Sequence, residues 1–159
     1  MKRLLTTLLL MVAVGYVAAQ PKAIEVDLWP NGAPKENGLT GPEQPLENGR
    51  VANISRATLY IYPAPTPNAQ AIIACPGDGY RRLAMNHEGH DMATWMNKQG
   101  ITYAVLKYRM PNGDITIPIS DALQAIRTLR ERADEWNIDP QKVGIMGASA
   151  GGNLAAQAA

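Results

Sequence analysis

Ser149 is the residue of this sequence whose surroundings most directly indicate chemistry. It lies at the centre of Gly147-Ala148-Ser149-Ala150-Gly151, directly after the apolar run Lys142 to Gly147. A serine on a tight strand-to-helix turn, with glycines two residues before and after it, is typical of a nucleophile elbow. Glycines at 147 and 151 relieve crowding against neighbouring backbone. The alternative, a turn that only packs a helix against a strand, needs no serine. We therefore predict Ser149 as a catalytic nucleophile.

Hydrolysis of an ester passes through a tetrahedral oxyanion, so backbone N–H groups must point at the developing charge. The stretch Cys75-Pro76-Gly77-Asp78-Gly79-Tyr80 follows an apolar run and is rich in glycine. We predict an oxyanion hole formed by the Asp78 and Gly79 region together with the N–H of Ala150. Tyr80 is a possible pocket residue, although a tyrosine at such a place is as often part of the packing. The alternative for the whole stretch is a plain turn.

A serine nucleophile needs a base, and neither of the two histidines in the chain follows Ser149. His87 and His90 lie in Asn86-His87-Glu88-Gly89-His90, a spacing that differs from H-E-x-x-H and offers no recognisable third ligand, so no metal site is predicted. His87 as a replacement base stays open, because a triad depends on geometry rather than chain order. The plainer interpretation is that His87 and Glu88 shape the start of a helix and the rim of the pocket.

The elements that must position these residues follow from the hydrophobic pattern. Strands are predicted at Ile24 to Leu28 and Ala57 to Pro65 from alternation and composition, and buried parallel strands at the short apolar runs. These runs are Ala71 to Gly77, Ile101 to Tyr108 and Lys142 to Gly147. Strands separated by helices favour an α/β fold with a mostly parallel sheet and helices on both faces.

Three helices are predicted between and after these strands. The first runs from about Glu88 to Gln99 and ends at Gly100, and the third begins near Ala150. For the second, Asp121 and Gln124 suggest a capping box at its start. The apolar face predicted for this helix consists of Ala122, Leu123, Ile126, Leu129, Ala133 and Trp136.

The stretches Cys75 to Tyr80, Asn86 to Pro111 and Asp121 to Ala156 resemble those of α/β-hydrolases, most closely exported bacterial carbohydrate esterases such as acetylxylan esterases and feruloyl-esterase-like proteins. The resemblance implies the α/β-hydrolase fold, with no cofactor. That family usually has glycine where this chain has Asp78, and a carboxylate there would oppose an oxyanion unless it points away. The family also places its triad acid and histidine after the serine. We therefore expect a fragment of about half the hydrolase domain, truncated after the elbow and itself close to inactive.

The N-terminus combines Lys2 and Arg3, an apolar run from Leu4 to about Val14, and small residues before Gln20. This order is typical of a secretory signal peptide cleaved after Ala19. The apolar run is shorter than the ~20 residues of a membrane span, so no stable membrane insertion is predicted after cleavage. The domain expectation is a signal peptide at 1–19, a strand and loop region at 20–55, and the N-terminal half of the hydrolase domain at 56–159. The expected location is secreted or periplasmic.

Composition excludes some partners and limits the covalent chemistry. The net charge is +1 and no basic run follows the first residues, so no nucleic-acid partner is predicted. The lone cysteine, Cys75, ends an apolar run and is predicted to be buried. The leading hypothesis is a serine esterase acting on an ester-substituted, xylan-type plant polysaccharide. Two alternatives stay open, a non-catalytic carbohydrate-binding pseudoenzyme and a serine peptidase of the prolyl-oligopeptidase type.

Overall fold

The computed structural model describes residues 22–159 of the chain. The predicted signal peptide at 1–19 lies outside the described residues. Within residues 22–159, no helix is both long and apolar enough to cross a bilayer.

A five-stranded sheet forms the centre of the fold, in the order β1-β4-β7-β5-β8. Its strands are β1 (Ile24–Asp27), β4 (Thr58–Tyr62), β7 (Thr102–Lys107), β5 (Ala71–Cys75) and β8 (Val143–Gly147). β5 pairs in parallel with both β7 and β8, whereas β4 pairs antiparallel with β7 and β1 antiparallel with β4. Four strands therefore point the same way and β4 alone is reversed. Parallel neighbours bring the carboxyl ends of β5, β7 and β8 to one edge, where such sheets place their sites.

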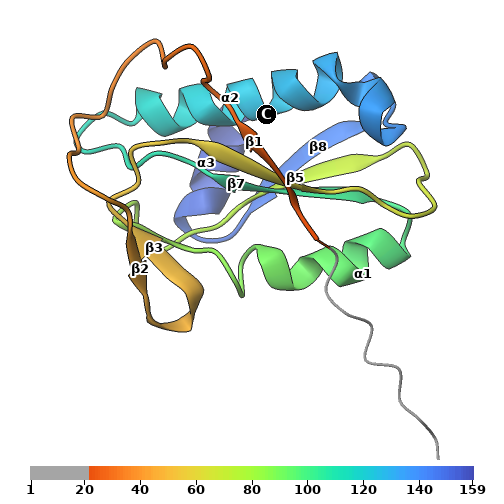
Figure 1. Cartoon of the computed structure of the whole chain (residues 1–159), viewed down its shortest axis with the longest axis horizontal. Coiled ribbons are helices and arrows are strands. Elements are labelled where there is room, and N and C mark those ends of the chain that lie inside the picture. The colour runs from red at the N-terminus through yellow and green to blue at the C-terminus, as the bar shows by residue number, and fades with distance from the viewer. Residues whose placement is uncertain (1–21) are drawn as a thin grey trace, which may run out of the picture.

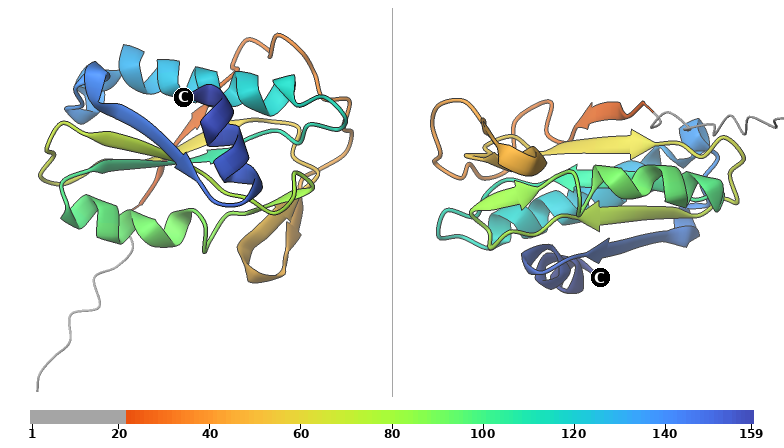
Figure 2. Two further views of the ribbon diagram at one scale, coloured as in Figure 1. Left: turned by 180° about the vertical axis from the view of Figure 1, so that it is seen from behind. Right: turned by 90° about the horizontal axis from the view of Figure 1, so that it is seen from below.

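Helices cover both faces of this sheet (Figure 1). α1 (Ala93–Lys98) contacts β7, while α2 (Thr116–Glu131) and α3 (Ala150–Ala158) contact each other, β5 and β8. Figure 2 shows α3 beside β8 when the molecule is seen from behind. Short 3₁₀ helices complete the backbone: η1 (Glu47–Gly49), η2 (His90–Met92), η3 (Ala133–Trp136) and η4 (Pro140–Lys142). The predicted fold class is confirmed: a mostly parallel sheet with helices on both faces.

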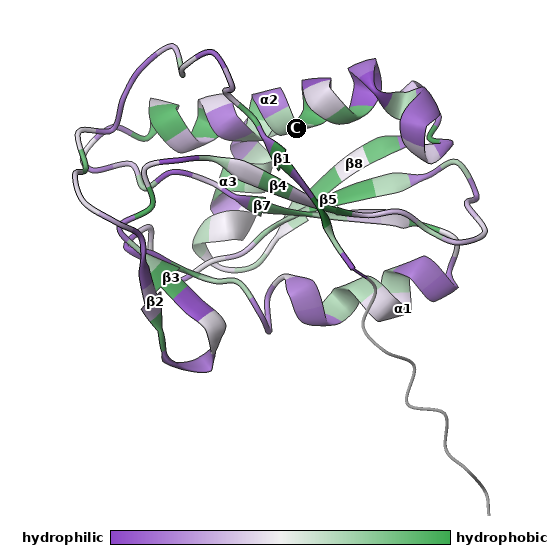
Figure 3. Ribbon diagram, viewed as in Figure 1, coloured by the Kyte–Doolittle hydropathy of each residue, from purple (hydrophilic) through white to green (hydrophobic). Residues whose placement is uncertain are grey.

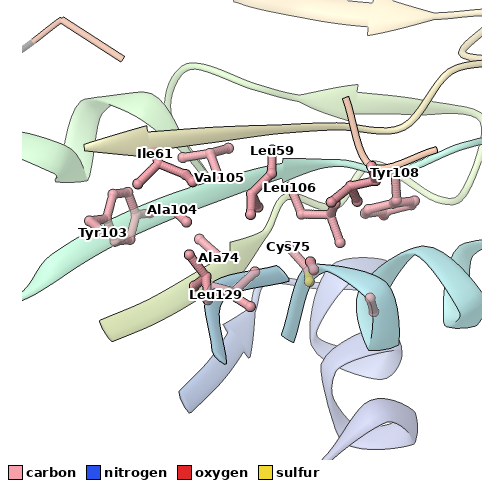
Figure 4. Close-up of a cluster of buried hydrophobic side chains, with 14 of the residues drawn as sticks. Leu59, Ile61, Ala74, Cys75, Tyr103, Ala104, Val105, Leu106, Tyr108 and Leu129 are labelled. Atoms are coloured by element: carbon pink, nitrogen blue, oxygen red, sulfur yellow. The ribbon is translucent and has the colours of Figure 1, made fainter. Parts of the chain in front are cut away.

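The core lies between the sheet and its helices. Hydrophobic residues run along β5, β7 and β8 (Figure 3), and all six residues of β7 are buried. Figure 4 shows Leu59 and Ile61 of β4 beside β7, with Leu129 of α2 on the other side near β5. Cys75 is fully buried in this cluster, as predicted, and burial raises the pKa of its thiol to about 12.

The sequence did not predict a second, three-stranded antiparallel sheet beside the first. It consists of β2 (Gln44–Leu46), β3 (Arg50–Ala52) and β6 (Arg82–Ala84), in the order β2-β3-β6. Each strand has three residues, too few to show a period of two, and β2 contains Pro45. β6 follows the predicted oxyanion loop directly, so this small sheet supports that loop from one side.

The first helical segment differs from its prediction at Glu88 to Gln99. Residues 85–89 form turns, η2 follows, and α1 begins only at Ala93. Gly89 is buried so tightly that a Cβ there would lie 2.5 Å from the carbonyl oxygen of Met85. The His90 N–H donates to that same carbonyl oxygen at 2.8 Å. This close contact holds the chain in a turn where the helix was predicted to begin.

The capping box predicted at Asp121 is wrong, because α2 begins five residues earlier, at Thr116. Asp114, two residues before the helix, accepts the N–H of Thr116 on its Oδ1 at 2.9 Å. Pro118 lies in the first helical turn, where a missing N–H costs little. On the predicted apolar face most residues are buried, but Leu123 is exposed.

Asp121 is instead the centre of a buried ion pair. Its side chain is 0% exposed and that of Arg109 is 1% exposed. Arg109 Nη2 lies 2.7 Å from Asp121 Oδ1, and the Arg109 N–H donates to Asp121 Oδ2 at 2.9 Å. Trp29 Nε1 donates to Asp121 Oδ1 at 2.7 Å, and Arg109 Nη1 donates to the carbonyl oxygen of Lys35 at 2.6 Å. The pair therefore ties the segment after β1 to α2 and to the end of β7.

Candidate active site

Ser149 lies between β8 and α3 and has φ 50° and ψ −121°. This backbone conformation is one that a non-glycine residue seldom adopts, and it persists only where the surroundings hold it. The side chain is exposed at the carboxyl edge of the sheet, directly before the first turn of α3. The geometry is that of a strand-turn-helix elbow carrying an accessible hydroxyl.

Close backbone contacts surround the elbow at Gly147 and Gly151. A Cβ at Gly147 would lie 2.2 Å from the carbonyl oxygen of Gly151. A Cβ at Gly151 would lie 1.8 Å from the carbonyl oxygen of Cys75 and 2.7 Å from that of Pro76. No side chain fits at such distances, so α3 can pack against the end of β5 only because both positions are glycine.

Replacing Gly151 with alanine is therefore expected to lower the free energy of unfolding by about 2–3 kcal/mol. The added methyl group must push α3 away from the backbone of β5, because the atoms that it would contact are backbone atoms with no freedom to rotate. Gly144→Ala is the matched control, since a Cβ at Gly144 has its nearest contact at 3.9 Å and the backbone needs no positive φ. The control should stay within about 1 kcal/mol of the original protein. Equal urea-denaturation midpoints for the two variants would contradict this account of the elbow.

The predicted oxyanion loop, residues 76–80, packs directly against the elbow. A Cβ at Gly77 would lie 2.5 Å from the carbonyl oxygen of Ala148 and 3.0 Å from Ser149 Cβ. The next three residues all have positive φ: 114° at Asp78, 69° at Gly79 and 58° at Tyr80. The loop thus bends sharply beside the hydroxyl of Ser149.

Five backbone N–H groups of the loop and the elbow have no partner within residues 22–159. Those of Asp78, Gly79, Tyr80, Ser149 and Ala150 donate no hydrogen bond, whereas that of Gly77 donates to Glu88 Oε2 at 2.6 Å. Gly77 is thus excluded as an oxyanion donor, and the predicted donors Asp78, Gly79 and Ala150 are among the groups left for a ligand. Free N–H groups beside a nucleophile are the arrangement that stabilises an oxyanion.

The carboxylate of Asp78 is turned toward the small sheet. Asp78 Oδ2 accepts hydrogen bonds from Arg82 Nε at 2.6 Å and Arg50 Nε at 2.8 Å. The bond from Arg82 and then that from Arg50 lower the pKa of this carboxyl, so it is ionised at neutral pH. Two guanidinium groups face one carboxylate, and its charge is compensated.

Tyr80 and His87, the two predicted pocket residues, lie in different surroundings. Tyr80 lines a cavity of about 460 Å³ with Leu39, Met110 and Asn112, and its hydroxyl donates to Asn153 Oδ1 at 3.0 Å. His87 is exposed and is not among the residues that line this cavity, and its Nε2 lies 3.8 Å from Glu88 Oε1.

Glu88 has a role that the sequence did not reveal. Instead of facing a helix end, its carboxylate accepts the N–H of Gly77 and so braces the start of the loop. Tyr108, the residue after β7, also holds the start of this loop, because its buried hydroxyl donates to the carbonyl oxygen of Pro76 at 2.7 Å. Tyr108 and Arg109, which follow β7, are both buried in the protein interior.

The remaining histidine, His90, packs against tyrosines of β4. His90 Nδ1 is 2.7 Å from the hydroxyl of Tyr62, and its ring packs edge-on against Tyr60. Burial lowers the pKa of His90. Another cavity, of about 550 Å³, is lined by Glu25, Glu43 and Lys107 and contains none of the predicted site residues. Among residues 22–159, no three histidine, cysteine or acidic side chains gather as metal ligands would.

Comparison with known proteins identifies the family. The model of the BD-FAE family matches residues 58–159, which is more than half of the chain and includes both the loop and the elbow. This chain belongs to the BD-FAE family. The resemblance to esterases of the α/β-hydrolase superfamily, which the motifs indicated, is confirmed.

Two curated relatives of this BD-FAE chain are bacterial. The acetylxylan esterase of Xylanibacter ruminicola is 45% identical over 104 residues, which are 65% of this chain and 22% of the relative. The endo-1,4-beta-xylanase B of Butyrivibrio fibrisolvens is 34% identical over 90 residues, which are 52% of this chain and 14% of the relative. This chain thus matches less than a quarter of the length of each of these curated relatives.

Solved structures give the same fold. An acetyl ester-xyloside bifunctional hydrolase from Caldicellulosiruptor lactoaceticus is 31% identical, with a TM-score of 0.62 over 87% of this chain and 47% of that one. A thermophilic esterase, Est2, from Thermogutta terrifontis is 25% identical, with a TM-score of 0.57 over 87% of this chain and 44% of that one. This chain spans about half the length of the solved structures it matches.

Proposed function

We propose that the protein is a serine carboxylic-ester hydrolase that removes acetyl or feruloyl groups from a xylan-type polysaccharide. The observation that carries the proposal is the elbow of Ser149, strained and exposed, packed against a loop whose free N–H groups match the needs of an oxyanion. The names of an acetylxylan esterase and an acetyl ester-xyloside hydrolase among the relatives support the choice of an ester on a xylan.

In the proposed reaction, Ser149 Oγ attacks the ester carbonyl carbon and its proton passes to a general base. The carbonyl π electrons move to the oxygen, and the N–H groups of Gly79 and Ala150 donate to the resulting oxyanion. Collapse of this intermediate breaks the bond to the sugar oxygen, which leaves with a proton, and the acyl group stays on Ser149. Water then attacks the acyl-enzyme and releases the carboxylic acid. No step requires a cofactor.

The cavity beside Tyr80 supports a sugar-bearing substrate. It borders the oxyanion loop and mixes apolar side chains such as Leu39 and Met110 with the amides of Asn53 and Asn112. Pyranose rings present both apolar faces and hydroxyl groups, and such a lining offers contacts to each. We place the sugar that carries the ester in this cavity, with its acyl group directed toward Ser149.

We also propose that the protein is exported, with a signal peptide at 1–19. The support is the order of charged, apolar and small residues in that segment. N-terminal sequencing of protein recovered outside the cytoplasm should begin at Gln20. Recovery of the protein only from the cytoplasm, with its first residues intact, would contradict export.

The proposed function is tested with the product of the complete reading frame, because the proposal concerns the whole protein. Acetate and ferulate release would be measured from acetylated xylan and from feruloylated arabinoxylan, with the same polysaccharides de-esterified by alkali as blanks. Release of either acid above the blank is the expected result. Absence of release from both substrates, by a protein shown to be folded, would overturn the proposal.

A further inference from the structure

The oxyanion loop contains a residue whose backbone conformation requires an explanation. Asp78 has φ 114°, in the left-handed region that favours glycine, and it is followed by two more residues with positive φ. A residue in this region is held there by interactions with its surroundings. Two backbone bonds are made to the loop: the Arg81 N–H donates to the carbonyl oxygen of Asp78 at 3.4 Å, and the Ala84 N–H donates to that of Gly77 at 3.0 Å.

Two arginines of the small sheet hold the side chain of Asp78. Arg50 begins β3 and Arg82 begins β6, and these strands pair antiparallel with Arg50 opposite Ala84. Since residues two apart on a strand share a face, Arg50 and Arg82 extend from the same face of the small sheet. Both Nε atoms reach the same oxygen, Asp78 Oδ2, at 2.8 and 2.6 Å. The side chains of Arg50 and Asp78 are partly buried, with 28% and 24% exposed, whereas that of Arg82 is 48% exposed.

From these contacts we propose that Arg50, Asp78 and Arg82 form an ionic latch that fixes the oxyanion loop for catalysis, with Asp78 and both arginines as positioning residues. This inference rests on the proposed function of Ser149. The latch has two effects. It anchors the loop at the residue with the least favourable φ, and it compensates a carboxylate that would otherwise oppose the negative charge of the intermediate.

If the latch exists, removing the two arginines alone should lower kcat more than removing the arginines and Asp78 together. In Arg50→Met/Arg82→Met the carboxylate stays beside the hole without compensation, so kcat should fall about 10- to 100-fold while KM changes less than about threefold. Adding Asp78→Gly to this variant removes the charge and gives position 78 a residue that accepts φ 114°. Most of the lost kcat should then return.

Salt and a matched arginine provide two further comparisons. Raising the ionic strength from 0.1 to 1 M shortens the Debye length from about 10 to about 3 Å, so kcat of the original protein should decrease and that of the triple variant should not. Arg56→Met is the control for loss of an arginine, because Arg56 forms an exposed pair with Asp27, at 2.6 Å, outside the loop. It should retain the original kcat and salt response.

The closing experiment measures kcat, KM and hydrogen–deuterium exchange of residues 76–84 in the original protein and these variants. Faster exchange in Arg50→Met/Arg82→Met but not in Arg56→Met supports the latch even where no esterase activity is found, in which case only the proposed function fails. Conversely, an active protein whose double-arginine variant keeps the original kcat and exchange overturns the latch and leaves the esterase standing. Loss of kcat that Asp78→Gly fails to restore also overturns it, because the arginines would then act independently of Asp78.

Discussion

Ser149→Ala is expected to lower ester hydrolysis by about 10⁴-fold or more in the complete protein. The loss follows from the chemistry, because without Oγ no acyl-enzyme can form and only the oxyanion donors remain. Folding should not change, since serine and alanine share the Cβ that experiences the strained φ of 50°. The measurement is initial-rate release of acetate together with a denaturation curve of each protein.

The Ser149→Ala measurement needs two controls. One replaces a serine outside the site, and the other separates the effect of backbone strain at position 149 from the loss of the hydroxyl. Ser55→Ala serves as the first, because Ser55 lies before β4 and lines cavities that do not include the elbow. Ser149→Gly serves as the second: it should be as inactive as the alanine variant but more stable by about 1–3 kcal/mol, since glycine tolerates positive φ. Turnover retained in Ser149→Ala would show that another group is the nucleophile.

Asp121→Ala should have the largest effect on stability, a loss of about 3–5 kcal/mol in the free energy of unfolding. The substitution leaves the guanidinium of Arg109 buried without its carboxylate, and it removes the acceptor for Trp29 Nε1. Urea denaturation at constant pH measures the change. Because the loss of stability arises from an unpaired buried charge, replacing an exposed aspartate should not produce a loss of this size.

Two comparisons make that cause testable. Asp139→Ala removes an aspartate that is 36% exposed, accepts the N–H of Gln141 and forms an exposed pair with Lys142 at 3.6 Å, so it should cost about 1 kcal/mol. Arg109→Met/Asp121→Leu removes both charges and should be clearly less destabilising than the sum of the two single substitutions. A double variant that loses the full sum would show that the two residues stabilise the fold independently of each other.

Sequence patterns predicted the central sheet because its strands have strong local features. Runs such as Ala71 to Cys75 are apolar on both faces, as buried parallel strands must be, and their ends are marked by proline and glycine. The elbow could also be predicted from the sequence. Positions 147 and 151 must be glycine because the turn itself brings backbone atoms close to them. Elements that depend on neighbouring residues can therefore be predicted from sequence patterns.

Long-range pairings could not be predicted in this way. Asp121 has the sequence features of a helix cap, and only the fold shows that Arg109 and Trp29 reach it from other elements. Arg50 lies 28 residues before Asp78, in a strand too short for any period, so nothing local indicates their ion pair. The same limit applies to Glu88, whose partner is a backbone N–H eleven residues away.

The strand order has a consequence for how the chain folds during synthesis. β5 lies between β7 and β8, and its Ala71 pairs with Thr102 on one side and Val143 on the other. On the ribosome, β7 is made about 40 residues before β8, which at ~5–20 residues per second leaves one edge of β5 unpaired for about 2–8 s. The nascent chain thus presents the apolar strand Ala-Ile-Ile-Ala-Cys with an open edge during that interval. Chaperone binding to nascent chains should accordingly decrease once β7 has emerged and decrease again once Val143–Gly147 clears the exit tunnel.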